Sequence, residues 1–342
     1  MSWAHAATFT DASHHCSQEK ETYMRLERER KTLKLLATEL RGMPQPLCAA
    51  RLICSGQDKD MLRLVMPACL GGDLQDLMES QGKLSDEHVQ FYSACVVLAL
   101  KFLHELQIAY RDLKPENVML DESGWPVLID FGLVSLSLAD GPATSMVGTP
   151  EFMAPEIVDG SGHNGQADMW SLGVMMCELL TGTTPFADPE PGNNNHQKTY
   201  ANILQGKFTK QFTQKEFKRL PKRTAEVIEG LLQVDAEKRL GIDPEGTKDT
   251  LRIHPFFWGL SWDALENRNY DPPHAEVTKE RASGVLTKVH AAPHTPLPRT
   301  GTTLGPVPHR SRNSARVTED GQSGNQDAAA SAMDKLFDFS EW

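Results

Sequence analysis

The segment from residue 110 to residue 132, YRDLKPENVMLDESGWPVLIDFG, constrains the fold of this chain more than any other. Two short apolar runs, at residues 118–120 and 127–129, flank a polar segment that contains Gly124. This pattern is typical of a β-hairpin with a glycine in its turn. Because a hairpin brings its two ends together, we expect the polar residues at its entry and exit to face one pocket.

Four polar side chains occupy those two ends. Asp112, Lys114 and Asn117 precede the first strand, and Asp130 follows the second. Carboxylate and amide oxygens are ligands that Mg²⁺ takes together with phosphate oxygens, and Lys114 adds a compact positive charge. The set therefore favours phosphoryl transfer, in which positioning and charge neutralisation supply most of the catalysis.

Three motifs in order resemble those of the protein kinases. Residues 110–117 are similar to the catalytic loop, with Tyr110 in the usual His position, residues 130–132 (DFG) to the metal-binding motif, and residues 154–156 (APE) to the end of the activation segment. An isolated DFG is interpreted as an ordinary turn, but three motifs in this order argue against coincidence. The LKPEN form of the loop resembles that of serine/threonine kinases.

The resemblance implies a role for each of the four polar residues. Asp112 would orient or deprotonate the substrate hydroxyl, and Lys114 would face the transferring phosphate. Asn117 and Asp130 would hold the metal ion. The implied cofactors are ATP and Mg²⁺.

The resemblance runs from about Met24 to Trp258 and is to the AGC group, in particular the cyclic-AMP-dependent and cyclic-GMP-dependent kinases. It implies that Asp168, on a buried helix, holds the backbone of the catalytic loop. It also implies a buried ion pair between Glu156 and Arg239, for which the alternative is that Arg239 is an ordinary surface cation.

The activation segment is expected to carry a regulatory phosphate. Ser145, with Thr144 beside it, occupies the position where the resembled group is phosphorylated, and Arg111 would bind that phosphate through charge-assisted hydrogen bonds. The resemblance further implies that Thr149 forms hydrogen bonds with Asp112 and Lys114. A regulatory or activating kinase is therefore an expected partner.

Three acids indicate the substrate class. Asp73, Glu116 and Glu178 match positions that read arginines on the N-terminal side of the target hydroxyl in the resembled kinases. Each of them alone is more simply a solvated surface carboxylate. Together they favour peptide substrates with basic residues, of the Arg-Arg-x-Ser/Thr kind.

The nucleotide site is assigned by the same resemblance. Met66 would be the gatekeeper, the backbone around Cys69 would border the adenine, and Met119 would form its floor. Glu29 is the best match for the helix glutamate that pairs with the phosphate-gripping lysine, with Glu27 a weaker choice.

Part of the expected small lobe has no counterpart in the sequence. Only 28 residues precede Glu29, no G-x-G-x-x-G occurs before it, and Lys20 is too close to it to be the strand lysine. Residues 160–165, GSGHNG, fit G-x-G-x-x-G by letter but follow the APE motif and are interpreted as a surface loop. We therefore expect a truncated small lobe.

The remaining elements are predicted from periodicity, caps and turn residues. Helices are expected at residues 21–40, 73–80, 85–106, 167–181, 225–234 and 247–253, and strands at 47–54 and 61–66. Residues 271–330 have few large apolar side chains, so we expect mostly disorder there.

The predicted organisation has four parts. They are a loose leader (1–19), a residual small lobe of one helix and two strands (20–66), a large lobe (67–258) and a largely disordered tail (259–342). The last residues, MDKLFDFSEW, resemble the hydrophobic motif that ends AGC kinases, although a generic amphipathic tail is the alternative.

Composition limits the partners. A formal net charge of −11 argues against nucleic acid and is compatible with basic peptides. The six cysteines form no C-x-x-C pair, as expected for reduced thiols in a cytoplasmic protein. The first residues lack the pattern of a secretory signal, and no apolar run is long enough to span a membrane.

The sequence thus predicts an α+β, protein-kinase-like fold with a mainly helical large lobe. The predicted function is ATP-dependent phosphorylation of serine or threonine in basic, arginine-rich peptide contexts. The alternatives are a catalytically impaired pseudokinase that works as a scaffold or regulator, or a fragment from an incomplete gene model.

Overall fold

The structure is a computed structural model that describes residues 16–40, 49–57, 62–136, 143–187, 196–210, 212, 216–241 and 249–291. The described residues up to Leu286 belong to one compact unit. Within these ranges no helix is both long and apolar enough to cross a membrane. The hydrophobic motif predicted at the C-terminus lies outside the described residues.

Helix α1, Cys16–Glu39, is the predicted helix of residues 21–40 with an earlier start. Residues 16–19 were expected in the loose leader, but they continue the helix because no proline or glycine interrupts them. Leu33, Leu36 and Leu40 are at most 2% exposed, so the leucine spacing seen in the sequence is the buried face of α1.

Strands β1, Cys54–Gln57, and β2, Leu62–Val65, form an antiparallel pair. The prediction of a strand at residues 47–54 was wrong, because the strand begins where that prediction ended. The register pairs Cys54 with Val65 and Gln57 with Leu62, so residues 55–57, expected in the turn, belong to the strand. The partner strand, rather than local apolar character, sets this boundary.

Strands β3, Val118–Leu120, and β4, Pro126–Leu128, form the second antiparallel pair and confirm the hairpin on which the sequence prediction rests. Ile129, predicted to end the second strand, lies just beyond it, and its N–H donates to the carbonyl of Asn117 at 3.1 Å. The two ends of the hairpin are therefore joined by a backbone hydrogen bond.

Helices make up most of the rest of the described chain. Their bounds are Leu74–Gln81 (α2), Asp86–Glu105 (α3), Pro155–Val158 (α4), Gln166–Thr181 (α5), Gln197–Leu204 (α6), Lys222–Leu231 (α7), Trp262–Glu266 (α8) and Ala275–Ala291 (α9). Short 3₁₀ helices lie at Pro115–Asn117, Pro150–Phe152, Phe217–Arg219, Ala236–Lys238 and Pro255–Phe257.

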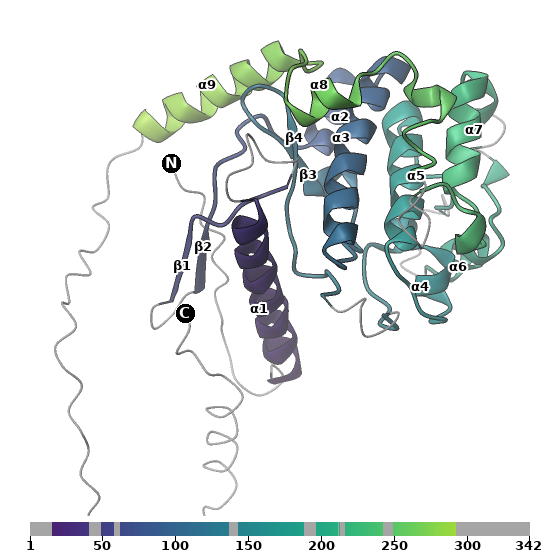
Figure 1. Ribbon diagram of the computed structural model, residues 1–342, viewed down its shortest axis with the longest axis horizontal. Helices are drawn as coiled ribbons and strands as arrows, with labels where there is room; N and C mark the ends of the chain where they lie inside the picture. Colours follow the sequence, from purple (N-terminus) through teal and green to yellow (C-terminus); the bar gives the residue numbers. More distant parts are fainter. Residues whose placement is uncertain are drawn as a thin grey trace, which may run out of the picture. The chain divides into compact units, whose positions relative to one another are not determined.

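Helices α3 and α5 lie side by side at the centre of the large lobe (Figure 1). Ser85 caps α3 as predicted. Helix α5 ends at Thr181, and Gly182, which follows it, adopts the left-handed conformation expected of a glycine that ends a helix. A Cβ on Gly173 would lie 2.9 Å from the Cβ of Leu231, so this glycine lets α7 approach α5 closely. The core thus fixes α5, which carries Asp168 toward the catalytic loop.

The region after residue 241 departs from the predictions in three places. One is helix α8, Trp262–Glu266, which lies inside the tail (259–342) that was expected to be largely disordered. Residues 249–253, the described part of a predicted helix, form turns. Residues 275–291, expected to be disordered, form helix α9. This helix is stabilised by contacts that composition does not reveal: Thr278 is fully buried, and Arg281 donates to the carbonyls of Gly71 and Asp76, both at 3.0 Å.

Candidate active site

Asp168 of α5 holds the backbone of the catalytic loop in place through hydrogen bonds. This carboxylate is fully buried and accepts hydrogen bonds from the backbone N–H groups of Tyr110 (2.9 Å) and Arg111 (2.7 Å). It also lies 2.7 Å from Nε2 of His104, a residue that the sequence did not single out. Arg111 has φ +70°, a conformation that L-residues rarely adopt, and the two N–H contacts to Asp168 stabilise it.

Asp112 lies in a network with three of the predicted residues. Its Oδ1 accepts from the backbone N–H of Thr149 at 3.1 Å and from its hydroxyl at 2.9 Å. Its Oδ2 accepts from Nδ2 of Asn117 at 3.0 Å, and Nζ of Lys114 lies 3.7 Å away. Lys114 in turn donates to the Thr149 hydroxyl at 2.9 Å. The contacts predicted for Thr149 are therefore present in the structure.

Asn117 and Asp130 offer oxygen donors of the kind that a hard cation takes. The amide nitrogen of Asn117 donates to the carbonyl and carboxylate of Asp112, which leaves its amide oxygen for another partner. Asp130 has φ +53°, and its Oδ1 accepts from the N–H of Gly132 at 3.1 Å. No group of three or more His, Cys, Asp or Glu side chains that suits a metal occurs in the described ranges. A carboxylate and an amide oxygen are donors that a divalent ion takes together with phosphate oxygens, so the residue types of Asn117 and Asp130 fit such an ion.

Glu29 lies beside the DFG segment, where the sequence predicted the helix glutamate. Burial first, and then the charge of Asp130, raises its pKa to about 7, while a hydrogen bond from the backbone of Phe131 opposes the rise. The adjacent Arg28 donates to the carbonyl of Gly132 at 3.1 Å. Among the residues that the structure describes, no lysine or arginine forms an ion pair with Glu29. Glu27, the weaker choice, pairs with Arg30 instead.

The guanidinium of Arg111 reaches the predicted phosphorylation site. Its Nη1 donates to Oγ of Ser145 at 2.9 Å, and its other nitrogens donate to the carbonyls of Leu133 and Val134. Burial, followed by the nearby charge of Arg28, lowers the pKa of Arg111 to about 10. The side chains of Ser145 and Thr144 are exposed, so both are accessible to another enzyme.

The three residues predicted to border the adenine lie on the linker and the hairpin. Met66 follows β2, and Met119 is in β3, where it forms a backbone bridge with Asp73. Burial, and then the charge of Asp121, raises the pKa of the Cys69 thiol to about 11. The Cys69 side chain therefore lies near Asp121 and Glu122, in the turn between β3 and β4. That the backbone of Cys69 borders the nucleotide remains a prediction.

The acidic residues predicted to bind substrate differ in their surroundings. Asp73 caps α2, with its Oδ1 accepting from the N–H of Asp76 at 2.7 Å. Glu178 is largely buried, and burial, together with the charges of Glu116 and Glu151, raises its pKa to about 7. The structure thus adds Glu151 to the group, and its place directly after the Thr-Pro of the activation segment is the one signal that could have indicated it.

A cavity of about 280 Å³ opens beside two of these acids, Glu151 and Glu178, and is otherwise lined by residues that follow α5 and by Phe212. Oε2 of Glu178 has no hydrogen-bond partner in the described part of the chain. A carboxylate that is buried without a partner is costly, so this oxygen favours a ligand that brings hydrogen-bond donors.

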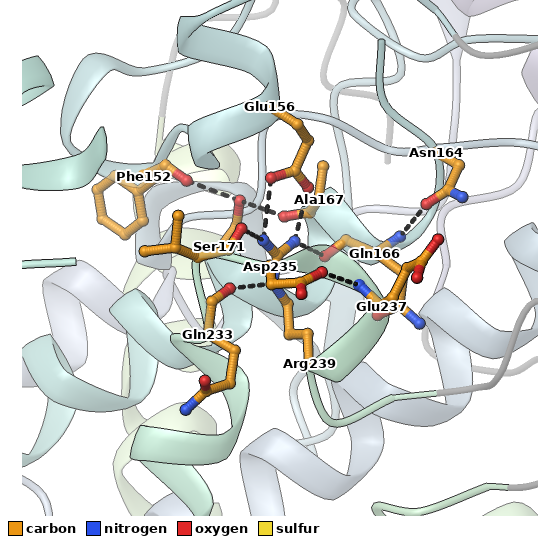
Figure 2. Close-up of polar contacts among 11 residues, drawn as sticks. Phe152, Glu156, Asn164, Gln166, Ala167, Ser171, Gln233, Asp235, Glu237 and Arg239 are labelled. Carbon is orange, nitrogen blue, oxygen red and sulfur yellow. Dashed lines mark hydrogen bonds and ion pairs between the residues drawn. The ribbon is translucent and has the colours of Figure 1, made fainter. Parts of the chain in front are cut away.

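The predicted ion pair between Glu156 and Arg239 is present (Figure 2). Two guanidinium nitrogens contact the two carboxylate oxygens at 2.6 and 2.9 Å, and the Arg239 side chain is fully buried. Arg239 also donates to the carbonyls of Gln166 and Gln233 and lies over the ring of Trp170. Arg239 is therefore not the solvated surface cation of the alternative interpretation.

Comparison with known proteins places this geometry in a family. Residues 16–257 match the family described as "Protein kinase domain". The chain is 36% identical over 235 residues to a cGMP-dependent protein kinase of Drosophila melanogaster, isozyme 2 forms cD5/T2, with 69% of this chain and 24% of that protein covered. It is 36% identical over 218 residues to the cGMP-dependent protein kinase egl-4 of Caenorhabditis elegans, with 64% of this chain and 27% of that protein covered.

The chain thus spans about a quarter of the length of these curated relatives. The relatives confirm the resemblance to AGC kinases of the cyclic-nucleotide-dependent type, and the helical lobe with its short hairpins confirms the predicted fold class. On the match over residues 16–257, the chain belongs to the protein kinase domain family.

Proposed function

We propose that this chain is a serine/threonine protein kinase that transfers the terminal phosphate of ATP to hydroxyl groups in basic peptide segments. One observation carries the proposal: Asp112, Lys114, Asn117 and Thr149 form a connected network. The carbonyl of Asn117 accepts from the N–H of Ile129, the residue directly before Asp130. An acceptor for the hydroxyl proton, a cation for the phosphate and oxygen ligands for a metal ion are the parts that phosphoryl transfer requires.

Each member of the network has a distinct task in this mechanism. The Thr149 N–H and hydroxyl fix Oδ1 of Asp112, so the carboxylate is oriented before the substrate arrives. Asp112 then accepts a hydrogen bond from the substrate hydroxyl and takes its proton, and Lys114 stabilises the charge on the transferring group. Asn117 and Asp130 would hold the divalent ion. Bound ATP and its metal supply the phosphoryl group and neutralise its negative charge.

Glu178 supports the preference for basic substrates. Its unpartnered Oε2 lines a cavity, and Glu116 and Glu151 concentrate negative charge around it. An arginine that entered this cavity would donate two parallel hydrogen bonds to a carboxylate. Asp73, which lies near Glu116 and caps α2, would add its negative charge to that of these acids.

Phosphorylation of Ser145 is proposed as the regulatory step. Arg111 already donates to the Ser145 hydroxyl, so a phosphate there would bind a preformed cationic site and order the activation segment. An activating kinase is accordingly a proposed partner. The free thiols of Cys69, Cys95 and Cys177 suit the reducing cytoplasm, which is our proposed location.

Glu29, which pairs with no described lysine or arginine, favours a second candidate, a kinase-like scaffold that binds peptides without turning over ATP. Each charge-assisted phosphate contact that a lysine would supply is worth about 1.5–3 kcal/mol. The loss of two such contacts would slow the reaction by several orders of magnitude.

One set of measurements separates the two candidates. Steady-state phosphorylation of an Arg-Arg-x-Ser peptide is measured for the full chain and for Asp112→Asn, and ATP binding is measured by thermal shift with and without Mg²⁺. A kinase loses about 10²–10⁴-fold in kcat on this substitution. Equal rates for both proteins, or no effect of ATP and Mg²⁺ on the melting temperature, would rule out the proposed chemistry. Peptide binding without turnover would establish the scaffold.

A further inference from the structure

Arg111 is a buried cation whose guanidinium contacts only uncharged groups. It is 6% exposed, and its three nitrogens contact two backbone carbonyls, the hydroxyl of Ser145 and Nε2 of His163. In the described part of the chain, no carboxylate accepts from this guanidinium. A cation in such a place favours an anionic ligand, because charge-assisted hydrogen bonds are about twice as strong as neutral ones.

His163 is the least explained side chain of this group. It is 2% exposed, and two backbone hydrogen bonds with Ala143, at 2.9 and 3.0 Å, hold it against the strand-like segment that leads to Ser145. Its Nε2 lies 3.4 Å from Nη1 of Arg111. Since a guanidinium can only donate, Nε2 is the acceptor, and the ring is neutral with its proton on Nδ1. That N–H has no hydrogen-bond partner among the described residues.

Ser145 and His163 share one nitrogen of Arg111. The distances from Nη1, 2.9 Å to the hydroxyl oxygen and 3.4 Å to Nε2, add to 6.3 Å, which is the greatest possible separation of the two atoms. A charge-assisted hydrogen bond covers about 2.8 Å of such a gap. The Oγ–P bond and one further P–O bond of a phosphoserine would extend across part of the remaining distance. A phosphate on Ser145 would therefore lie beside Arg111 and extend toward His163.

We propose that His163 is the second arm of the phosphate site at Ser145: when Ser145 is phosphorylated, His163 takes a proton from solvent and donates from Nε2 to the phosphate beside Arg111. The inference rests on the proposed phosphorylation of Ser145. In the unphosphorylated chain His163 serves as an uncharged acceptor for Arg111, and the incoming phosphate replaces it in that role. The activation segment then binds a proton together with its phosphate.

The groups around His163 determine whether phosphorylation raises or lowers the pKa of its side chain. In the unphosphorylated chain, burial first and then the charge of Arg111 lower its pKa, whereas Asp168 and Glu156 oppose them. Glu156 is already paired with Arg239. A phosphate, which carries a charge of about −1.5 to −2, would raise the pKa of His163 above the value it has in the unfolded chain. The stabilisation by phosphate is then larger at pH 6 than at pH 8, because it decreases as the pH rises through the new pKa.

The test uses the full chain with phosphoserine installed at position 145 by an expanded genetic code, compared with the unmodified chain. Side-chain ¹⁵N NMR of the histidines follows protonation, and the spectrum of His163→Gln assigns the signal. We expect the titration midpoint of His163 to rise by at least one pH unit on phosphorylation. The midpoint of His254, which caps the 3₁₀ helix Pro255–Phe257, is expected to stay unchanged.

A second readout needs no assignment. Phosphorylation should raise the melting temperature more at pH 6 than at pH 8, and His163→Gln should abolish that difference while it preserves the unmodified fold. A His163 midpoint that rises by less than one pH unit on phosphorylation, or an unchanged pH dependence in His163→Gln, would refute the proposal. Because phosphoserine is incorporated during translation, these outcomes do not depend on whether cells phosphorylate Ser145. Peptide mapping of protein from a eukaryotic host decides that separate question.

Discussion

Replacing Arg239 by alanine should be among the most destabilising single changes in this chain. The substitution leaves the carboxylate of Glu156 without its partner, although that side chain is only 11% exposed. It also removes the donors that satisfy the carbonyls of Gln166 and Gln233 and the contact with the Trp170 ring. Breaking a buried ion pair from one side costs about 3–5 kcal/mol. That is a large part of a total stability of about 5–15 kcal/mol.

The expected loss translates into a measurable shift. For a domain of this size a change of 1 kcal/mol moves the melting temperature by about 2–4 °C, so Arg239→Ala should melt roughly 6–20 °C lower. Urea unfolding followed by tryptophan fluorescence gives the free energy directly.

Two matched variants make the reasoning refutable. Lys238→Ala removes the neighbouring cation, whose side chain is 75% exposed, and should leave the midpoint of unfolding almost unchanged. The double variant Glu156→Leu with Arg239→Met replaces the pair by apolar groups and should cost less than Arg239→Ala alone. If Arg239→Ala costs below 1 kcal/mol, or no more than Lys238→Ala, the pair is not a major source of stability.

Three further predictions concern other elements. Asp168→Asn should destabilise the chain by about 3 kcal/mol in urea unfolding, because at least one backbone N–H of the catalytic loop loses a charged acceptor. Gly72→Ala should cost more than Gly82→Ala in thermal melts: both glycines have positive φ, but only at Gly72 would a Cβ lie 2.7 Å from Nη1 of Arg281. Glu178, whose pKa burial raises to about 7 from 4.5, should make the chain less stable as the pH rises from 4.5 to 7, since the unfolded state ionises first. Glu178→Gln should remove that slope, and a slope that persists would contradict the assignment.

Local patterns were enough to predict the parts of the fold whose chemistry is contained in neighbouring residues. The hairpin at residues 118–128 follows from two short apolar runs and a turn, and the ends of α3 and α5 follow from Ser85 and Gly182. Each of these depends on backbone conformations and caps that a few adjacent residues determine. The prediction that the two ends of this hairpin lie close together is also confirmed, because Ile129 donates a backbone hydrogen bond to Asn117.

Predictions failed where the deciding partner is distant in the sequence. Helix α9 was expected to be disordered because its composition is weakly apolar, but Arg281 reaches Gly71 and Asp76 more than 200 positions earlier. The first strand of the β1–β2 pair was misplaced because its register is set by β2. Neither the contacts of Arg281 nor the register of β1 and β2 can be predicted from the residues adjacent in the sequence.

The amino-acid sequence by itself determined which residue types stand at the hairpin and the catalytic loop, and hence the class of chemistry they suit. Only the tertiary structure decided which charges have partners. Arg239 pairs with Glu156, whereas Glu29 has no partner among the described cations. Of the described residues, only neutral groups accept from the guanidinium of Arg111. The physical reason is that a hydrogen bond or ion pair acts over about 3 Å, so its existence depends on distances that only the folded chain establishes.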